Sequence, residues 1–281
     1  MIVYYNGAFM NQSEVCISPD DRGFLFGDGT YEVIKVYNQS IFRLTEHLQR
    51  LKRSLREIRM NGVDLDDLAK VLGTLVKKNA GLSANAAIYV QITRGTGARS
   101  HRFPTALRPT IYAAVSETVI PPELRKKGVK IILVTDQRWG RCDIKSISLL
   151  ANVLAAEEAH RQEAYEAVFI RDGLITEGTR TNIALISDGT VRTHPPDHHI
   201  LGGITRDIVL ELCRELKIPV SEQPFHPDQL LEADEIFIMG TTTEICPVIQ
   251  VNDLFIRDGE PGTITMKIQK AFQKLIDGNE I

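Results

Sequence analysis

Several features that would assign the chain to a special class of protein are scarce or absent. It has 281 residues with 1 Trp and 4 Cys. The cysteines lie far apart and form no C-x-x-C pair, so neither a zinc knuckle nor a redox motif is indicated. We expect reduced cytosolic thiols. The 33 Lys and Arg nearly balance the 36 Asp and Glu, for a net charge of −3. Such a balance argues against a protein that binds nucleic acid through phosphates.

Signals for targeting or for membrane insertion are also missing. The first basic residue is Arg22, so the N-terminus lacks the charged region of a signal peptide. The longest apolar run, residues 149–156, is interrupted by Asn152 and is far shorter than the roughly 18 residues that span a bilayer. We therefore expect a soluble, cytoplasmic protein that binds neither membrane nor nucleic acid.

The composition is that of an ordinary globular protein, with 43% hydrophobic and 25% charged residues. A chain of this length predicts about two domains. The polar stretch from Ser116 to Lys130, with Pro121-Pro122 inside it, is typical of a surface linker. We predict an N-terminal α+β domain over residues 1–118, a linker over 119–130 and a larger C-terminal mixed α/β domain over 131–281.

Turn dipeptides and hydrophobic periodicity predict the elements of both domains. In the N-terminal domain we expect a hairpin at Asn6-Gly7, strands over 31–37, 86–93 and 110–115, a helix with an apolar stripe over 44–58 that is N-capped by Thr45, and a helix over 65–75. In the C-terminal domain we expect strands over 129–134 and 235–239, hairpins at Asp172-Gly173 and Asp188-Gly189, and helices over 149–162, 205–216 and 263–276.

Lys145 is the most suggestive candidate for chemistry. It stands among Ile144, Ile147, Leu149 and Leu150 in RCDIKSISLLANVLA. Apolar surroundings disfavour the ammonium form, and the neutral amine is a nucleophile that can form a Schiff base. A lysine whose stem lies along the surface is the commoner case, so the choice depends on what lies near it.

Two segments predict sites for a phosphate group. In Leu201-Gly202-Gly203-Ile204-Thr205 the glycines precede a helix whose first N–H groups, with the Thr205 hydroxyl, face outward at the positive end of the dipole. The threonines of Gly240-Thr241-Thr242-Thr243 follow a strand, and Arg50 can add charge. Neither segment is a nucleotide motif, so a single phosphate monoester fits better than a nucleotide. Taken alone, each segment is more often an ordinary turn or helix cap.

Glu177 completes this inventory. It ends a predicted strand in TEGTRTN, where its carboxylate can accept a hydrogen bond from a protonated ring nitrogen. Together with Lys145 and the phosphate segments it predicts a pyridoxal 5'-phosphate site. His194, His198 and His199 lie in THPPDHH, where the prolines oppose a regular ligand spacing, so we expect no metal.

At these residues the sequence resembles the fold-type IV pyridoxal phosphate enzymes, which include branched-chain aminotransferases, aminodeoxychorismate lyases and D-amino acid transaminases. The resemblance covers nearly the whole chain and is greatest to the D-amino acid transaminases. It implies the two-domain fold-type IV architecture, with a pseudo-barrel C-terminal domain. It rests on DRGFLFGDGTYEVIKVYN, EHLQRL, ITRGTGARSHRFP, RWGRCDIKS, TEGTRTN, THPPDHHILGGITRD and TTTEICPVI.

The resemblance implies a role for each candidate residue. Lys145 holds the cofactor and moves the proton, and Glu177 pairs with the pyridine nitrogen. Tyr31 contacts substrate, while Arg99 and His101 grip the substrate carboxylate, reaching in from the partner subunit of a homodimer. The phosphate ligands that it implies are Arg50, Ile204, Thr205 and Thr241.

The implied reaction is a ping-pong transamination between D-amino acids and 2-oxo acids, such as D-alanine and 2-oxoglutarate. An L-specific branched-chain aminotransferase, the lyase of the same fold and a phosphate-ligand binding protein without turnover are the alternatives. Two positions depart from the family pattern. Ala184 stands where an aromatic residue is usual, and Gly240 where a serine often contributes to phosphate binding.

Overall fold

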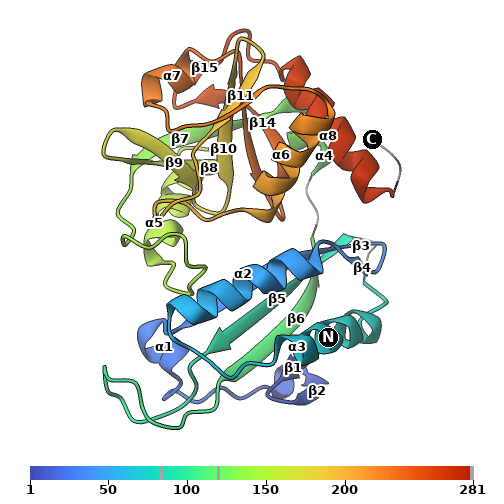
Figure 1. The fold of residues 1–281 in the computed structure, drawn as a ribbon, viewed down its shortest axis with the longest axis vertical. Coiled ribbons are helices and arrows are strands. Elements are labelled where there is room, and N and C mark those ends of the chain that lie inside the picture. The colour runs from blue at the N-terminus through green and yellow to red at the C-terminus, as the bar shows by residue number, and fades with distance from the viewer. Residues whose placement is uncertain (83–84, 119–120, 279–281) are drawn as a thin grey trace. The chain divides into compact units, whose positions relative to one another are not determined.

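The computed structural model describes residues 1–82, 85–118 and 121–278 (Figure 1). Contacts between Cα atoms divide the chain into two compact units. The first unit is Met1–Val119 with Ile144–Leu149, and the second is Ile120–Asp143 with Leu150–Ile281. Within the predicted linker, Val119 and Ile120 lie outside the described residues, and Pro122–Lys127 form helix α4.

The first unit is built on an antiparallel sheet in the order β2-β1-β6-β5-β3-β4. Leucines of α2 and α3, including Leu51 and Leu72, pack with Ile34, Ile88 and Val90 of the sheet in one hydrophobic core. The elements of this unit are β1 (Ile2–Tyr5), β2 (Ala8–Asn11), the 3-10 helix η1 (Gln12–Glu14), α1 (Arg22–Phe26), β3 (Gly29–Tyr37), β4 (Ser40–Ile41), α2 (Leu44–Glu57), α3 (Leu65–Lys78), β5 (Asn85–Thr93) and β6 (Thr110–Glu117).

The second unit holds a mixed sheet in the order β12-β11-β10-β13-β14-β7-β8-β9, and β15 pairs with β14. β11 and β12, β14 and β7, and β7 and β8 pair in parallel, and the other neighbours are antiparallel. Its elements are α4, β7 (Val129–Thr135), α5 (Leu150–Arg161), β8 (Glu166–Arg171), β9 (Leu174–Gly178), β10 (Asn182–Ser187), β11 (Thr190–Thr193), α6 (Ile204–Glu215), β12 (Val220–Glu222), α7 (Pro227–Leu231), β13 (Glu235–Gly240), β14 (Glu244–Val251), β15 (Leu254–Phe255) and α8 (Thr263–Ile276).

The predicted fold class, with mixed helices and sheets in two parts, is confirmed. The three predicted hairpins form, and each has positive φ at both turn residues, for example 47° at Asn6 and 97° at Gly7. The amphipathic stripe over 44–58 becomes α2. Within the described parts of the chain, no helix is long and apolar enough to cross a membrane.

The predicted N-cap of α2 is wrong. Thr45 is the second residue of the helix, and the cap is Arg43, whose φ of 53° is left-handed. Arg43 makes no side-chain cap bond, although its guanidinium pairs with Glu46 at 2.9 Å. An ion pair within the first turn therefore replaces the hydroxyl cap that the sequence pattern favoured.

Candidate active site

Lys145 and Tyr31 lie together in the first unit. Residues 144–149 run beside β3, where the amide of Tyr31 donates to the carbonyl of Lys145 at 3.1 Å. The amide of Lys145 donates in turn to Oγ of Ser54, a buried residue of α2, at 3.2 Å. The Lys145 Nζ lies over the Tyr31 ring, 4.4 Å from its centroid. Backbone bonds on two sides thus fix the lysine, and its amine faces the predicted substrate-contacting tyrosine.

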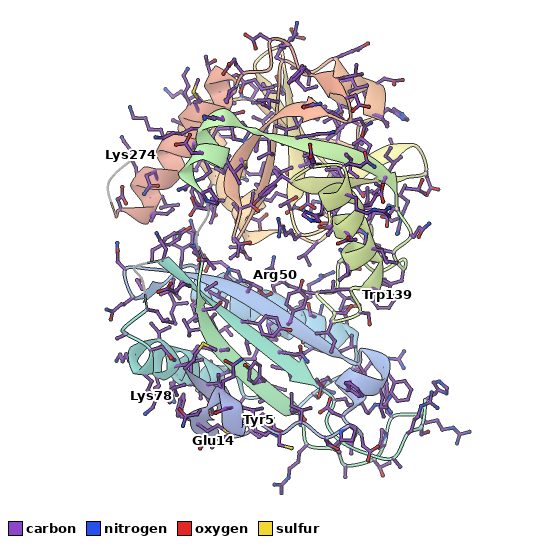
Figure 2. The ribbon with its side chains drawn as sticks, turned by 180° about the vertical axis from the view of Figure 1, so that it is seen from behind. Tyr5, Glu14, Arg50, Lys78, Trp139 and Lys274 are labelled. Carbon is purple, nitrogen blue, oxygen red and sulfur yellow. The ribbon has the colours of Figure 1, made fainter. Side chains whose placement is uncertain are left out.

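Arg50 lies on α2 (Figure 2) and belongs to a charged cluster with Glu32 of β3 and His47 of α2. Its Nε and Nη2 donate to the two carboxylate oxygens of Glu32, each at 2.8 Å. Glu32 is fully buried, and Nδ1 of His47 lies 2.8 Å from its Oε2. Burial alone raises the pKa of Glu32, but the charge and hydrogen bonds of Arg50 and the hydrogen bond of His47 hold it at about 2. The forked guanidinium is therefore fixed in one orientation by an ionised carboxylate.

His47 is held neutral in the same cluster. Burial lowers its pKa, and the charges of Arg50 and Lys145 lower it further, against the opposing effect of Glu32. Because Glu32 is ionised, Nδ1 of His47 carries the hydrogen between them. Neither Glu32 nor His47 was among the predicted site residues. The signal in the sequence was Glu32, a charged residue inside the mostly apolar strand TYEVIKVY. His47 and Arg50 are three residues apart, so they lie on one face of the helix that follows.

Glu177 is the penultimate residue of β9 in the second unit, where donors from Arg138, Asn182 and Leu201 hold its carboxylate. Arg138 Nη1 donates to Oε1 at 2.6 Å, and Asn182 Nδ2 and the amide of Leu201 donate to Oε2 at 3.2 and 3.0 Å. Arg138 was not among the predicted residues. Its guanidinium also pairs with Asp136 at 2.9 Å.

Arg138 stays charged although it is buried. Burial lowers its pKa, but the hydrogen bond to Asp136 and the charge of Glu177 more than offset this, so the pKa lies above its usual value. Its guanidinium carbon also lies 4.3 Å from the ring centroid of Phe169. The sequence offered no spacing that would link Arg138 to a carboxylate 39 residues later.

The predicted phosphate segment at the start of α6 adjoins this carboxylate. Ile204 and Thr205 form the first turn of α6, and both are buried. A Cβ on Gly203 would overlap Oδ1 of Asn182, the same residue whose amide holds Glu177. The glycine therefore lets the helix N-terminus approach Asn182 closely.

Thr241 lies in the turn that follows β13, next to the strand that carries Asn182. Met239 of β13 pairs with Asn182 of β10, and Gly240 ends β13 just before Thr241. A Cβ at Gly240 would lie 3.2 Å from the carbonyl of Arg180, which is a tight contact. The glycine that departs from the family pattern thus occupies a position with little room for a side chain.

These residues fit a phosphorylated pyridine. A helix N-terminus with a buried threonine, a close glycine approach and a second threonine loop suit a phosphate monoester. A fixed carboxylate beside them suits a protonated ring nitrogen. The structure places Glu177, Ile204, Thr205 and Thr241 in the second unit, and Tyr31, Arg50 and Lys145 in the first.

Arg99 and His101 lie in the loop between β5 and β6, also in the first unit. Both side chains are exposed. Each contacts Phe26, with the Arg99 guanidinium carbon 5.4 Å and the His101 ring centroid 5.5 Å from the centroid of that ring. The predicted pair therefore shares one aromatic support.

Two other features belong to no such site. His194, Asp197 and His199 have potential ligand atoms within 4.8 Å of one another, but His194 Nδ1 contacts the carbonyl of Pro195 at 2.8 Å and Asp197 accepts the amide of His199 at 2.7 Å. The loop's own bonds explain that cluster.

Burial raises the pKa of Cys142 to about 11, so its thiol is protonated at neutral pH.

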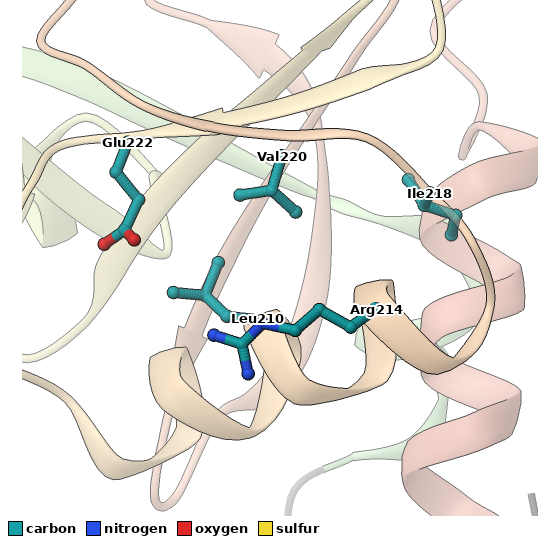
Figure 3. A pocket seen from close by; sticks show the side chains of 5 residues that line it. All are labelled: Leu210, Arg214, Ile218, Val220 and Glu222. Carbon is teal, nitrogen blue, oxygen red and sulfur yellow. The ribbon is translucent and has the colours of Figure 1, made fainter.

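A pocket of about 350 Å³ lies along the later turns of α6 (Figure 3). Leu210 and Arg214 project from the helix toward Val220 and Glu222 of β12. None of the predicted site residues lines this pocket. It is therefore separate from the phosphate segment at the start of the same helix.

The chemistry of these residues suits a pyridoxal phosphate enzyme, because an amine can bind the cofactor's aldehyde, a fixed carboxylate suits its ring nitrogen and a helix N-terminus suits its phosphate. The chain belongs to the class IV amino-transferases, whose family model matches residues 29–251. It is therefore an aminotransferase, and its cofactor is pyridoxal 5'-phosphate. The predicted family, activity and cofactor are confirmed.

Named relatives match almost end to end. A D-alanine aminotransferase of Bacillus licheniformis is 40% identical, over 98% of this chain and 97% of the relative. One of Staphylococcus aureus (strain N315) is 41% identical, over 99% of each chain. Among solved structures, an Escherichia coli branched-chain amino acid aminotransferase superposes with a TM-score of 0.92 at 26% identity, covering 99% of this chain and 96% of that one.

Proposed function

We propose that the chain transfers amino groups between D-amino acids and 2-oxo acids, converting D-alanine and 2-oxoglutarate to pyruvate and D-glutamate. The observation that carries the proposal is the 40% identity, across nearly all of both chains, to a relative named D-alanine aminotransferase. The Arg99 and His101 pair adds to it, since two such side chains suit a carboxylate.

The cofactor, when bound, supplies an electron-accepting ring that stabilises negative charge on the carbon that loses its proton. In the proposal, Glu177 accepts a hydrogen bond from the ring nitrogen and keeps the proton on that nitrogen. Arg138 keeps the carboxylate in place through its 2.6 Å bond. The N-terminus of α6 with Thr205, the Thr241 loop and Arg50 hold the phosphate.

Lys145 performs the proton transfer in this scheme. Its amine takes the α-proton from the substrate and returns it at the cofactor carbon that receives the amino group. Tyr31, whose ring lies beneath Nζ, limits where the amine can move. Arg99 and His101 bind the α-carboxylate and so decide which hydrogen faces the lysine.

The finer proposals concern assembly and location. We infer a cytoplasmic homodimer in which the Arg99 and His101 of one subunit complete the site of the other. The exposure of both side chains is compatible with a role across an interface. Four unpaired cysteines suit a reducing compartment.

A spectrum and a chiral assay test the proposal together. The purified enzyme should absorb visible light, and Lys145→Ala should lose that band while the control Lys127→Ala, which alters an exposed lysine, keeps it. The enzyme should consume D-alanine with 2-oxoglutarate. Consumption of L-leucine without D-alanine would instead favour the branched-chain activity named for the E. coli neighbour.

A further inference from the structure

The loop that carries Arg99 and His101 is tied to the segment before β3. At the base of the loop, the Arg94 amide donates to the Asp28 carbonyl at 3.1 Å, and the Gly97 amide donates to the Asp20 carbonyl at 3.2 Å. Backbone bonds thus fix the loop up to Gly97. What holds the residues beyond that point decides how accurately Arg99 and His101 are placed.

Arg22 reaches the loop between these two residues. Its side chain is 3% exposed, and its Nη1 donates to the carbonyl of Ser100 at 2.6 Å. Ser100 separates Arg99 from His101, so a bond to its carbonyl fixes the peptide that joins the pair. A charged donor makes this a stronger bond than one between neutral groups.

Asp28 fixes the Arg22 side chain in turn. Its Oδ2 accepts from Nε of Arg22 and from Nε of Arg94, each at 2.8 Å, and its Oδ1 accepts from Nη2 of Arg94 at 2.9 Å. Burial raises the pKa of Asp28, but the hydrogen bonds and charges of Arg94 and Arg22 lower it by more. The pKa therefore lies below its ordinary value. One ionised carboxylate therefore holds two arginines, and Arg94 in turn lies 3.7 Å from the ring centroid of Phe103, in the later part of the loop.

Arg22 also contacts Phe26, the aromatic ring on which Arg99 and His101 rest. The Arg22 guanidinium carbon lies 4.8 Å from the centroid of the Phe26 ring. Arg99 and His101 contact that ring at 5.4 and 5.5 Å. Arg22 thus acts on the pair by two routes, through the backbone of Ser100 and through the ring of Phe26.

The helix that contains Arg22 does not need this side chain. The Asp21 side chain caps the start of α1 by accepting the Gly23 amide, and Gly27 ends the helix with a φ of 64°. A buried guanidinium is costly to desolvate, and that of Arg22 donates to Asp28 and to the carbonyl of Ser100 in the distant loop. Its geometry is that of a group that orders the loop.

We propose that Arg22 is a positioning residue for the substrate carboxylate, acting through Ser100 and Phe26 on Arg99 and His101. The inference rests on the proposed function, in which that pair grips the carboxylate. Its consequence is that Arg22 controls the affinity for carboxylate substrates without touching them. A displacement of the clamp by a fraction of an ångström is enough to weaken a forked grip.

The test is a comparison of two substrates in Arg22→Gln. We expect the KM for D-alanine to rise about tenfold, the effect of losing a charged hydrogen bond, while kcat changes little. The apparent affinity for D-alaninol, which has the amine and side chain but no carboxylate, should stay within about twofold of wild type. Arg22→Lys keeps the charge beside Asp28 but lacks the fork, so it should recover only part of the D-alanine affinity.

Arg43→Gln is the matched control, because it removes the same charge and a 2.9 Å ion pair elsewhere in the first unit. It should leave both affinities unchanged. If Arg22→Gln does not fold, Phe26→Leu removes the ring platform and should raise the KM for D-alanine in the same selective way. An equal loss of affinity for D-alanine and D-alaninol in a folded variant would overturn the proposal.

A double-mutant cycle separates this inference from the function on which it rests. If Arg22 acts through the clamp, adding Arg22→Gln to Arg99→Ala should change the KM for D-alanine much less than it does in wild type. If Arg99→Ala raises the KM for D-alanine and Arg22→Gln does not, the role of Arg22 is rejected and the carboxylate clamp is kept. An unchanged KM in Arg99→Ala would reject the carboxylate clamp itself.

Discussion

Glu32 shows how one buried residue shapes the proposed phosphate site. Both of its carboxylate oxygens accept from Arg50, so the forked face of that guanidinium is turned toward β3. A guanidinium is not deprotonated in proteins, so Arg50 keeps its positive charge in this pair, and a fixed positive charge suits the proposed phosphate contact. Arg50 therefore has a binding orientation before any ligand arrives, which lowers the entropic cost of binding.

Replacing Glu32 with glutamine should destabilise the protein in a pH-dependent way. The folded pKa of Glu32 is about 2, against an ordinary value of 4.5, so its stabilising effect is complete above pH 4.5 and is lost as the pH falls toward 2. At neutral pH, Glu32→Gln should lower the free energy of unfolding by about 3 kcal/mol. Urea denaturation at a series of pH values measures the difference from wild type, which should shrink below pH 4.5.

Glu46→Gln provides the comparison for that experiment. Glu46 pairs with Arg43 at 2.9 Å, but its side chain is 38% exposed. A pair of this kind contributes about 0.2–1 kcal/mol, so its loss should be minor. Equal effects of the two substitutions, or a Glu32 difference that does not vary with pH, would contradict the role assigned to the buried cluster.

At this scale the sequence yielded the candidate site residues but not the residues that hold them. Lys145, Glu177 and Thr205 stand in motifs that local chemistry and resemblance identify. Glu32 is 18 residues from Arg50, and Arg138 is 39 residues from Glu177, and only the fold brings each pair together. A charged residue inside an apolar strand signals a buried partner without saying which one.

At the scale of elements, the junction of α6 with β10 positions the proposed phosphate and ring-nitrogen contacts together. Asn182 begins β10, holds Glu177 through its amide and faces Gly203 at the start of α6. Asn182, together with the Leu201 amide that donates to Glu177, therefore sets the spacing between the helix N-terminus and the carboxylate. A change at this junction should affect cofactor binding more than it affects the core.

Gly203→Ala tests the junction of α6 with β10, and Gly202→Ala, one residue earlier, is its control. The new methyl group would overlap Asn182 Oδ1, whereas a Cβ on Gly202 would meet nothing within 4 Å. The φ of Gly203 is −79°, so the substitution acts by overlap and not by backbone strain. We expect Gly203→Ala to weaken pyridoxal phosphate binding about tenfold, as overpacking of 1–3 kcal/mol implies, and Gly202→Ala to have little effect. Titration followed by absorbance measures both, and equal affinities would contradict the argument.

Elements with a local signal were predicted and the others were not. The hairpins follow from positive-φ dipeptides, and α2, α6 and α8 follow from their apolar spacing. Helix α4 forms inside a segment that was predicted to be a linker, because Pro122 can start a helix as well as break one. The three-residue strand β12 pairs in parallel with β11, and so short a run has no pattern of its own.

At the scale of the whole molecule, the position of the lysine segment depends on contacts that chain order does not reveal. Ile144–Leu149 follows β7 of the second unit, yet it groups with the first unit. Its partners are backbone groups of Gly29 and Tyr31, more than a hundred residues earlier in the chain. Backbone hydrogen bonds of this kind do not depend on side-chain type. The sequence could therefore single out Lys145 but could not predict that residues 144–149 pack with the first unit.

The proposed sharing of the site between subunits predicts complementation between two defective enzymes. Lys145→Ala lacks the reacting amine, and Arg99→Ala lacks the carboxylate grip, so each homodimer should be inactive at low D-alanine concentration. If Arg99 serves the site of the partner subunit, a mixed dimer has one site with both defects and one site with neither. After subunit exchange at equal amounts, half of the dimers are mixed, and activity should return to about a quarter of wild type. If Arg99 serves its own subunit, every site keeps one defect and no activity returns. Lys145→Ala mixed with the double variant Lys145→Ala, Arg99→Ala is the control, because no site in any of its dimers has the amine.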